Sequence, residues 1–554
     1  MKTTRVKKHY FLIAALLIGS VALLIYLPAL NHGFVNWDDP EYIYKNQNIQ
    51  SLDTSSLKWM FTEFYAANWH PLTWLSHAID FTLWDINPRG HHLSSILLHG
   101  LNSFLVALLL FYLISCQKTG HYKGPSHTTP VSLGTEDLIT VVLAGLLFAL
   151  HPLHVESVAW VSERKDLLCA CFFILTIILY ITYSTSAPGK KKGFTFAFCL
   201  FSTMLALLSK PMAVTIPAVL LLLDFYPLNR FNLRTTPTAL RTLLLEKIPF
   251  CLLSCSSIGI TIAAQQAWGA FSPLAARPLD IRLFVAAKSF CFYLLKMLVP
   301  THLSPLYPYP ANLSLFNLQV ISSLVCILAL VSICIILRKR YKVLTFVFAY
   351  YGITLFPVLG ILQVGGQAAA DRYTYLPSIG PFLLIGLTIS SLIKHFKKIK
   401  EHSPVTIYSI STLALLVLTC NAALTVKQIT FWKDPISLWN RVIAVYPDQS
   451  WVAYYNRGSA FFDSSRYQEA VKDFSSVIAL NPYYPLAHYQ RGKSHLRAGS
   501  YSDALRDFSR AIELDKTNPT FYAYRAQAYR KLGEHTKALK DSATALRLKT
   551  PPKK

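Results

Sequence analysis

The sequence predicts an all-α membrane protein, in which a polytopic bundle of about eleven spanning helices is followed by an α-solenoid of short helix pairs. Of its 554 residues, 53% are hydrophobic and only 15% are charged, a balance that ordinary soluble domains do not have. Several apolar runs approach or exceed the roughly 17 to 25 residues that cross a bilayer as a helix. From Trp451 onward this apolar character ends and a period of 34 residues begins, which is typical of paired-helix repeats.

The net charge of +25 indicates the orientation of these spans and does not require a nucleic-acid partner. Much of the positive excess lies in three short loops, at 190–192, 338–342 and 394–400. Short basic loops mark the cytoplasmic side of a membrane protein, and anionic membrane lipid is a second partner for them. The first apolar run, 10–30, follows a basic start without a small-residue cleavage site, which predicts an uncleaved span and a cytoplasmic N-terminus; cleavage is the alternative.

Under this orientation the apolar runs alternate across the membrane. They are residues 10–30, 93–115, 138–150, 167–183, 194–208, 213–225, 248–264, 315–337, 343–362, 381–393 and 405–426. A further run, 283–299, contains Lys288 and Lys296, and its crossing would place the basic end of 315–337 on the wrong side. We therefore expect 283–299 to lie along or dip into the outer surface. Everything after residue 426 is then extracytoplasmic, in a multi-pass cell membrane protein.

Three consecutive repeats close the chain. The repeats are 451–484, 485–518 and 519–552, after a membrane domain at 1–430 and a linker or capping helix at 431–450. Small residues recur at the eighth and twentieth positions, and Phe474 and Phe508 take the twenty-fourth position of the first two repeats. This is the tetratricopeptide pattern of two antiparallel helices per repeat, and three repeats make a stable stack. From Trp451 the chain has 18 Lys and Arg against 9 Asp and Glu, which indicates either a solvated basic face or an acidic or flexible polypeptide partner.

Three polar clusters fall on the predicted outer side, and the first is the long loop at 31–90. It contains two adjacent carboxylates, Asp38 and Asp39, and a segment rich in tryptophan and histidine that includes His70. The aromatic and histidine spacing predicts amphipathic helices at the interface. Two neighbouring carboxylates at an apolar boundary can divide labour, one ionised and one perturbed, which suits general-base work on a hydroxyl. A turn role is the alternative, because Asp-Pro is ordinary turn chemistry.

The second cluster lies between two predicted spans. His151, His154 and Glu156 are close enough in sequence to share one ligand, whether a proton or a metal ion, so they are candidate substrate contacts and also candidate ligands of a divalent metal. Arg164, Lys165 and Asp166 follow, and Arg and Lys side chains suit phosphate. Membrane-boundary anchoring is the alternative for the basic pair. A basic pair on the outer side runs against the positive-inside trend, however, which favours a functional reason.

The third cluster lies in a loop rich in glycine and alanine that precedes a predicted span. Asp371, Arg372 and Tyr373 follow small residues there, so backbone can approach a ligand closely and Arg372 can meet a phosphate. An Asp–Arg ion pair at a helix start is the alternative. Lys210, at the outer tip of a predicted hairpin, adds another cation. Acids and cations at one membrane face fit a lipid-linked phosphate, and the absence of a Walker loop from the sequence disfavours an energy-coupled pump.

Several motifs occur in an order that resembles a known family. "FVNWDDPEYI", "FALHPLHVESVAWVSERKDLL", "LLSKPMAVTIPAVLLLLDFYPL" and "DRYTYLPSIG" precede the repeats, and this arrangement resembles the transmembrane and tetratricopeptide-repeat O-mannosyltransferases and their bacterial relatives. The resemblance implies a GT-C type, inverting glycosyltransferase with a polyprenyl-phosphate sugar as donor, and it leaves metal dependence open. Asp38 and Asp39 match the family's acidic pair, and Arg164 and Arg372 match positions suited to the donor phosphate.

The resemblance also contains departures. Lys165 stands where the animal proteins tend to have a small residue, and the repeat array is short. Both departures leave the sugar and the acceptor open. As a further implication of the resemblance, the short loops and the absence of a eukaryotic-style extension suggest a bacterial inner-membrane protein with its repeats in the periplasm.

The resulting hypothesis is transfer of mannose or another hexose to a Ser or Thr hydroxyl or to an envelope glycan, with the repeats recruiting the acceptor. Asp38 or Asp39 is the expected catalytic base. The expected phosphate ligands are Arg164, Lys165, Lys210 and Arg372, and the expected substrate contacts are His70, His151, His154, Glu156, Asp166, Asp371 and Tyr373. Two rival functions remain: a non-catalytic membrane-anchored scaffold, and a lipid-linked polysaccharide polymerase or flippase.

Overall fold

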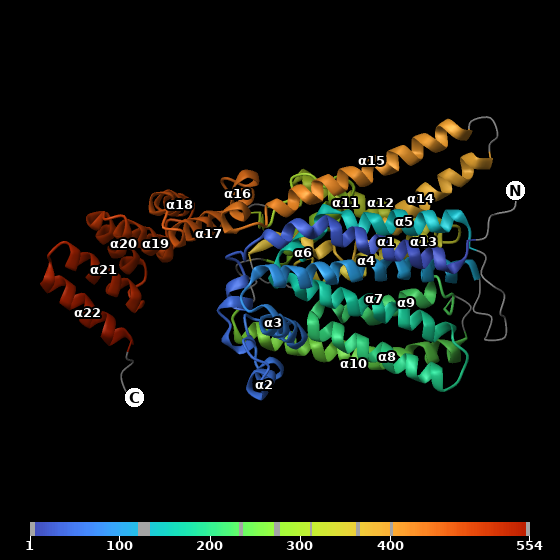
Figure 1. The fold of residues 1–554 in the computed structure, drawn as a ribbon, viewed down its shortest axis with the longest axis horizontal. Helices are drawn as coiled ribbons and strands as arrows, with labels where there is room; N and C mark the ends of the chain where they lie inside the picture. Colours follow the sequence, from blue (N-terminus) through green and yellow to red (C-terminus); the bar gives the residue numbers. More distant parts are fainter. Residues whose placement is uncertain are drawn as a thin grey trace. The chain divides into compact units, whose positions relative to one another are not determined.

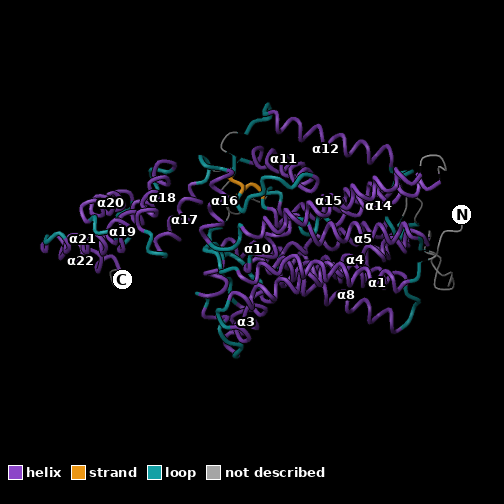
Figure 2. Tube along the Cα trace, turned by 45° about the horizontal axis from the view of Figure 1, so that its top comes forward, coloured by secondary structure: helices purple, strands orange, loops and turns teal. Residues whose placement is uncertain are grey.

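The computed structural model describes residues 6–119, 133–231, 236–270, 278–310, 313–361, 366–398 and 403–549. Helices dominate these ranges (Figures 1 and 2), and within them strand is limited to β1 (Tyr307–Pro308) and β2 (Gln367–Ala369). The chain forms two compact units. The first comprises residues 1–34, 38–303 and 309–432, and the second comprises residues 35–37, 304–308 and 433–554. An all-α fold is therefore confirmed.

The first unit is a bundle of long apolar helices. They are α1 (Lys8–Tyr26), α4 (Pro88–Thr119), α5 (Thr135–Leu150), α7 (Arg164–Thr185), α8 (Lys190–Ser209), α9 (Ile216–Phe225), α10 (Pro237–Ala267), α12 (Leu318–Leu337), α13 (Lys342–Leu355), α14 (Ile379–Lys398) and α15 (Ser403–Thr430). Four further helices join them: α2 (Thr54–Thr62), α3 (Pro71–Trp84), α6 (Val155–Ala159) and α11 (Leu279–Leu298). Each of the eleven apolar runs lies mainly on one helix of the first set, apart from residue 362, which is outside the described residues. The chain is therefore a multi-pass membrane protein.

The bundle contains more helices than the described residues contain candidate membrane spans. Within the described residues, eight helices are long and apolar enough to span a bilayer, and α5 with its continuation to Ala159, bent by 47°, makes up to nine. The segments Pro211–Phe225 and Lys342–Val358 are apolar but shorter. The count of about eleven therefore stays a prediction, as does the surface position of α11, which is not among the candidate spans found in the described residues.

One helix, α7, forms the centre of the bundle. Its apolar window is 67% buried within the protein, whereas that of α12 is only 11% buried. The backbone that leads into α7 is irregular: short turns at Pro152–His154 and Val161–Glu163 flank α6. Irregular backbone inside a membrane bundle is tolerated where it lines protein or a polar cavity. This break in the helix packing is what allows charged side chains to gather at the start of α7.

The second unit contains the repeats. Its helices are α16 (Pro435–Val445), α17 (Trp451–Asp463), α18 (Tyr467–Leu480), α19 (Pro485–Arg497), α20 (Tyr501–Leu514), α21 (Pro519–Lys531) and α22 (His535–Lys549). Glycine at the eighth repeat position allows close helix contact, because a Cβ added at Gly492 would lie 2.8 Å from the Phe508 ring. Each repeat also has a bidentate Arg–Asp pair: Arg457–Asp473, Arg491–Asp507 and Arg525–Asp541. These Arg–Asp pairs were not predicted from the sequence.

Candidate functional site

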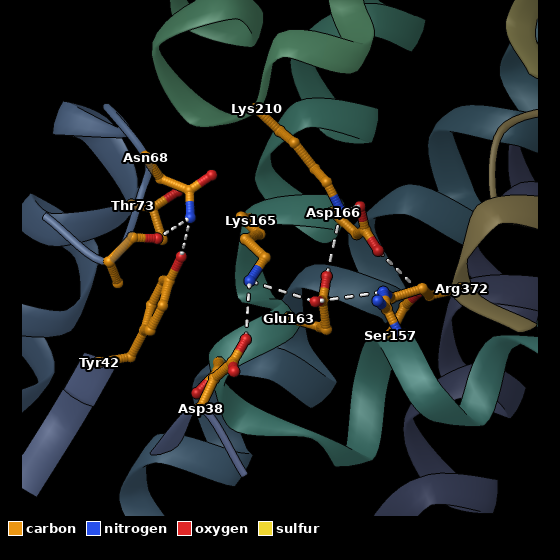
Figure 3. Close-up of polar contacts among 12 residues, drawn as sticks. Asp38, Tyr42, Asn68, Thr73, Ser157, Glu163, Lys165, Asp166, Lys210 and Arg372 are labelled. Atoms are coloured by element: carbon orange, nitrogen blue, oxygen red, sulfur yellow. Dashed lines mark hydrogen bonds and ion pairs between the residues drawn. The ribbon is translucent and has the colours of Figure 1, made fainter. Parts of the chain in front are cut away.

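Charged side chains from four separate segments meet at the start of α7 (Figure 3). The segments are the loop after α1, the irregular connection into α7, the turn after α8 and the turn before α14. We call the group the α7-start cluster; its members are Asp38, Glu156, Glu163, Lys165, Asp166, Lys210 and Arg372. It has four carboxylates and three cations, and its members extend in sequence from Asp38 to Arg372.

Glu163 is the hub of this cluster. Its Oε1 atom lies 3.1 Å from Lys165 Nζ and 3.3 Å from Arg372 Nε, and its Oε2 atom lies 3.2 Å from Lys210 Nζ. The side chain is only 2% exposed. A buried carboxylate is stable only when it is paired and hydrogen-bonded. Glu163 therefore draws together three cations that come from three different parts of the chain.

Two further acids fix the orientation of the cations. Asp166 Oδ1 lies 2.6 Å from Lys210 Nζ, and its Oδ2 atom accepts a hydrogen bond from Ser157. Glu156 forms an ion pair with the Arg372 guanidinium and also accepts the Arg372 backbone N–H at 2.9 Å. Such two-point contacts hold an arginine in one orientation. Glu156 and Asp166, both expected to contact substrate, thus hold the cations in place.

The structure separates the roles of the two adjacent aspartates. Asp39 is 1% exposed, and its Oδ1 atom accepts hydrogen bonds from the backbone N–H, at 3.1 Å, and the hydroxyl of Ser162. The Asp38 side chain is 40% exposed, and its Oδ2 atom lies 3.8 Å from Lys165 Nζ. Desolvation by the surrounding protein raises the pKa of Asp38 above its ordinary value, and the Lys165 ammonium opposes this rise. Of the pair, Asp38 is the carboxylate that is accessible to a ligand.

Arg164, in contrast, lies away from the three clustered cations although it precedes Lys165 directly. It is fully buried and forms an ion pair with Asp80. Its guanidinium also donates to the His91 carbonyl oxygen at 2.6 Å and to the hydroxyl of Ser76 at 3.3 Å. These partners come from α3 and α4. Arg164 therefore links α7 to the neighbouring helices, and the structure does not bring it to the other expected phosphate ligands.

The histidines considered as metal ligands are engaged elsewhere. His151 Nε2 lies 3.1 Å from the Met297 carbonyl oxygen, and its Nδ1 atom accepts the Leu153 N–H. His154 contacts the Phe148 carbonyl oxygen at 2.8 Å and the Ser378 hydroxyl at 3.1 Å. Within the described residues no three His, Cys, Asp or Glu side chains are placed to hold a metal ion together. The structure does not bring His151, His154 and Glu156 together around one ion, and a metal site formed by them stays a prediction.

The remaining predicted contacts lie around the cluster. The Tyr373 ring lies 5.0 Å from the Arg372 guanidinium, and its hydroxyl accepts a hydrogen bond from Gln367. Asp371 is buried at the start of the same turn, where its carbonyl oxygen accepts the Thr374 hydroxyl. His70 is buried near the cluster, and burial, followed by the charges of Lys165 and Lys210, lowers its pKa well below the ordinary value.

Two residues at this site, Glu163 and Tyr42, were not predicted from the sequence. Tyr42 lies in the turn Pro40–Tyr44 directly after the two aspartates, and the Lys165 ammonium lies 4.4 Å from its ring centroid. Glu163 was visible as the first residue of the charged run that continues with Arg164, Lys165 and Asp166. An acid directly beside two cations in an otherwise apolar segment was the available signal for it.

This fold and site define a class of protein: a multi-pass membrane protein with a buried charge cluster, an accessible carboxylate and a C-terminal array of tetratricopeptide repeats. Family models described as "TPR repeat" and "Tetratricopeptide repeat" match residues 458–499 and 489–551. The repeats also resemble the second TPR domain of Spaghetti (RPAP3) bound to an HSP90 peptide, at 28% identity over 18% of this chain and 94% of that one, with a TM-score of 0.18.

The homologues over most of the chain are protein O-mannosyl-transferases. The human Protein O-mannosyl-transferase TMTC4 is 25% identical over 503 residues, which are 83% of this chain and 65% of the relative. The Caenorhabditis elegans Protein O-mannosyl-transferase F38B6.6 is 24% identical over 85% of this chain and 63% of its own length. The chain thus spans a little under two thirds of these relatives. Their names support the resemblance noted from the motifs.

Proposed function

We propose that this chain is a membrane glycosyltransferase that moves mannose or another hexose from a polyprenyl-phosphate donor to a Ser or Thr hydroxyl of a protein or to an envelope glycan. The names of the homologues support a protein O-mannosyl-transferase. The observation that carries the proposal is the placement of Asp38, a partly exposed carboxylate, 3.8 Å from the first of three clustered cations. Such an arrangement puts a base beside a phosphate-binding group.

The proposed reaction is an inverting displacement. The Asp38 carboxylate takes the proton of the acceptor hydroxyl as its oxygen attacks the anomeric carbon. The bond between that carbon and the phosphate oxygen breaks, and the bonding electrons leave with the polyprenyl phosphate. Lys165, Lys210 and Arg372 stabilise the charge that develops on the leaving oxygen. Asp39 holds the turn that leads into α7, so that Asp38 keeps its distance from Lys165.

Glu163 gives this site a specific binding step. It is the one cluster carboxylate described here that contacts all three cations, so an entering phosphate competes with it for the same donors. The cluster has four carboxylates against three cations. We propose that donor binding draws Lys165, Lys210 and Arg372 from Glu163 toward the phosphate. When no substrate is bound, Glu163 neutralises these cations.

The membrane orientation forms part of the proposal. The basic loops at 190–192 and 394–400 favour a cytoplasmic N-terminus, with the α7-start cluster and the repeats on the extracytoplasmic side. The repeats would present the acceptor chain, and their excess of basic residues favours an acidic or flexible acceptor. A bacterial inner membrane is the expected location.

The test is direct transfer by the purified full chain in lipid nanodiscs. The donor is mannosyl phosphoryl polyprenol, the acceptor is a Ser- and Thr-rich polypeptide, and transferred hexose is measured by mass spectrometry. We expect transfer by the wild-type chain and by Asp280→Asn, an exposed acid at the start of α11, and loss of transfer by Asp38→Asn. Full activity of Asp38→Asn, or no hexose transfer by folded wild-type protein to any Ser or Thr acceptor, would end the proposal.

A further inference from the structure

Lys165 stands between a charged and a neutral half of the site. Figure 3 shows Glu163, Asp166, Lys210 and Arg372 on one side of it and Tyr42, Asn68 and Thr73 on the other. On the neutral side, Asn68 Nδ2 donates to the Tyr42 hydroxyl at 3.1 Å. Thr73 donates to the carbonyl oxygen of Ser209, the residue before Lys210, at 2.9 Å. The neutral half therefore lies directly beside the cations.

Three aromatic rings form a row on this half. His70, Trp74 and His77 are separated by four and three residues at the start of α3 and along it, a spacing that places them on one helix face. All three are buried. The Trp74 ring lies 4.6 Å from the Tyr42 ring, and Tyr42 in turn lies under the Lys165 ammonium. The row therefore faces the start of α7.

The polar atoms of this row lack partners. His70 Nδ1, Trp74 Nε1 and both ring nitrogens of His77 are buried without a hydrogen-bond partner among the described residues. Buried polar atoms in native proteins are almost always hydrogen-bonded, so such a group calls for a ligand or solvent. Four of them on one helix face, next to a proposed phosphate site, point to a ligand that offers several hydrogen-bonding groups at once.

The chemistry of the row selects a neutral, hydroxyl-rich ligand. Burial is the main cause that lowers the pKa of His70 and of His77 well below the ordinary value; the charge that adds most to it is Lys165 for His70 and Arg164 for His77. Both rings are therefore neutral. A neutral imidazole has one donor and one acceptor nitrogen, and an indole has one donor. These groups match hydroxyls, which donate and accept, better than they match an anion or a cation.

We propose that the neutral half is the subsite for the hexose ring of the donor, with hydroxyls hydrogen-bonded to the row on α3. This inference rests on the proposed function. The hexose is covalently attached to the phosphate, so a phosphate held by Lys165 and Lys210 brings the sugar to the adjacent surface. The anomeric carbon then lies at the border of the two halves, on the side of Lys165 where Asp38 also lies. The acceptor occupies the space next to Asp38.

The experiment compares two lipid probes on the purified full chain. One probe is polyprenyl phosphate, and the other is the same lipid with a mannosyl group on its phosphate. His70→Leu and His77→Phe remove the ring nitrogens. We expect each to weaken binding of the mannosyl lipid roughly tenfold, the effect of about one lost hydrogen bond, and to leave binding of the bare lipid phosphate unchanged. His70→Gln, which retains a polar side chain, should recover part of the loss. His395→Leu, an exposed histidine on α14, is the matched control.

The outcomes separate this inference from the proposed function. An equal loss for both probes would mean that the row supports the phosphate site or the fold, and no loss for either would mean that it meets only water; both results overturn the sugar subsite and leave the proposed function intact. Wild-type protein that binds neither lipid would overturn the proposed function itself.

Discussion

The central helix α7 has a group of charged and hydrogen-bonding side chains at each end, and the contacts within the two groups differ. We call the second group the α7-end cluster; its members are Tyr180, Asp224, Arg230, Glu246 and Lys247. Tyr180 lies fifteen residues after Lys165, which is about 22 Å along a helix. Two carboxylates face two cations there, whereas the α7-start cluster has four carboxylates and three cations.

The contacts of the α7-end cluster are reciprocal. Asp224 accepts the Tyr180 hydroxyl at 2.9 and 2.8 Å and lies 2.6 Å from Lys247. Arg230 meets both Glu246 oxygens at 2.9 Å. Its most exposed charged side chain, Glu246, is 15% exposed, whereas Asp38 is 40% exposed. A balanced and closed network locks helices together, and an unbalanced network with an accessible acid is suited to binding and chemistry.

The largest expected difference is between substitutions of one arginine in each cluster. Arg372→Met removes a group that stabilises the leaving phosphate, so we expect the transfer rate to fall roughly 10²- to 10³-fold. Arg230→Met removes an arginine from the closed network and should leave the transfer rate per folded molecule unchanged. The assay is hexose transfer normalised to folded protein. Similar losses in both variants would erase the functional distinction between the two clusters.

The closed network of the α7-end cluster should contribute to stability. Asp224→Asn removes the carboxylate nearest to Lys247, which is 2% exposed, while Glu246 stays paired with Arg230. We therefore expect the free energy of unfolding to fall by about 3 to 5 kcal/mol. The measurement is thermal unfolding of the purified chain in detergent. Asp280→Asn on α11 is the control and should change stability by less than about 0.5 kcal/mol. A melting temperature of Asp224→Asn equal to that of the control would show that the network does not lock the bundle.

Glu163→Gln tests whether Glu163 competes with the donor phosphate for the three cations. The free protein should become less stable, because three clustered cations lose their shared anion. Polyprenyl phosphate should bind roughly tenfold more tightly, a gain of about 1.4 kcal/mol, because it no longer displaces Glu163. Equilibrium binding and ligand-induced thermal shifts report the two quantities separately. Weaker binding of the lipid would assign Glu163 an organising role only.

The fall in transfer rate at low pH tests the assignment of Asp38 as the base. A base must be deprotonated to accept a proton, and burial raises the pKa of Asp38 above its ordinary value. Transfer should therefore fall as the pH drops through this raised pKa. Lys165→Met removes the cation that opposes the rise, so the fall in transfer should move to higher pH. The measurement is kcat/KM against pH for the wild-type chain and for Lys165→Met. If activity falls at the same pH in both proteins, another group titrates.

The sequence predicted the helices well and the interior contacts poorly. Apolar periodicity located the bundle, and the 34-residue period located the repeats, because both patterns are local. The pairing of Arg164 with Asp80 could not be predicted, since it depends on how α3 packs against the start of α7. Proximity in sequence also did not predict contact. His151, His154 and Glu156 are neighbours in the chain, but a turn at Pro152–His154 directs their side chains to different partners.

Asp38 and Asp39 illustrate the same limit. Their identity as an acidic pair was plain from the sequence, but the division between them was not. Ser162, which pairs with Asp39, is more than a hundred residues away, and so is Lys165, which lies near Asp38. Only the packing of the first loop on the start of α7 separates a buried acid from an accessible one. Local patterns can therefore nominate residues, whereas their roles follow from contacts distant in sequence.

The smallest expected effect concerns the turns beside the two clusters. Near the α7-start cluster, Ala66 and Ala67 have φ values of 49° and 61°, and Tyr65 and Asn68 pair across them. Near the α7-end cluster, Asn229 has a φ of 49°. Alanine is disfavoured in this left-handed region, whereas asparagine and glycine tolerate it. We therefore expect Ala67→Gly to stabilise the chain by about 0.5 to 1 kcal/mol.

The matched variant is Asn229→Gly, which relieves little strain and loses the hydrogen bond from Asn229 Nδ2 to the Pro227 carbonyl oxygen. It should therefore not raise the melting temperature. Because Asn68 and His70 follow the Ala66–Ala67 turn directly, Ala67→Gly should also loosen the loop that leads into α3. A higher melting temperature together with weaker binding of the mannosyl lipid would mean that the strain is retained to position this loop. A higher melting temperature with unchanged binding would mean that the turn is merely an unfavourable one.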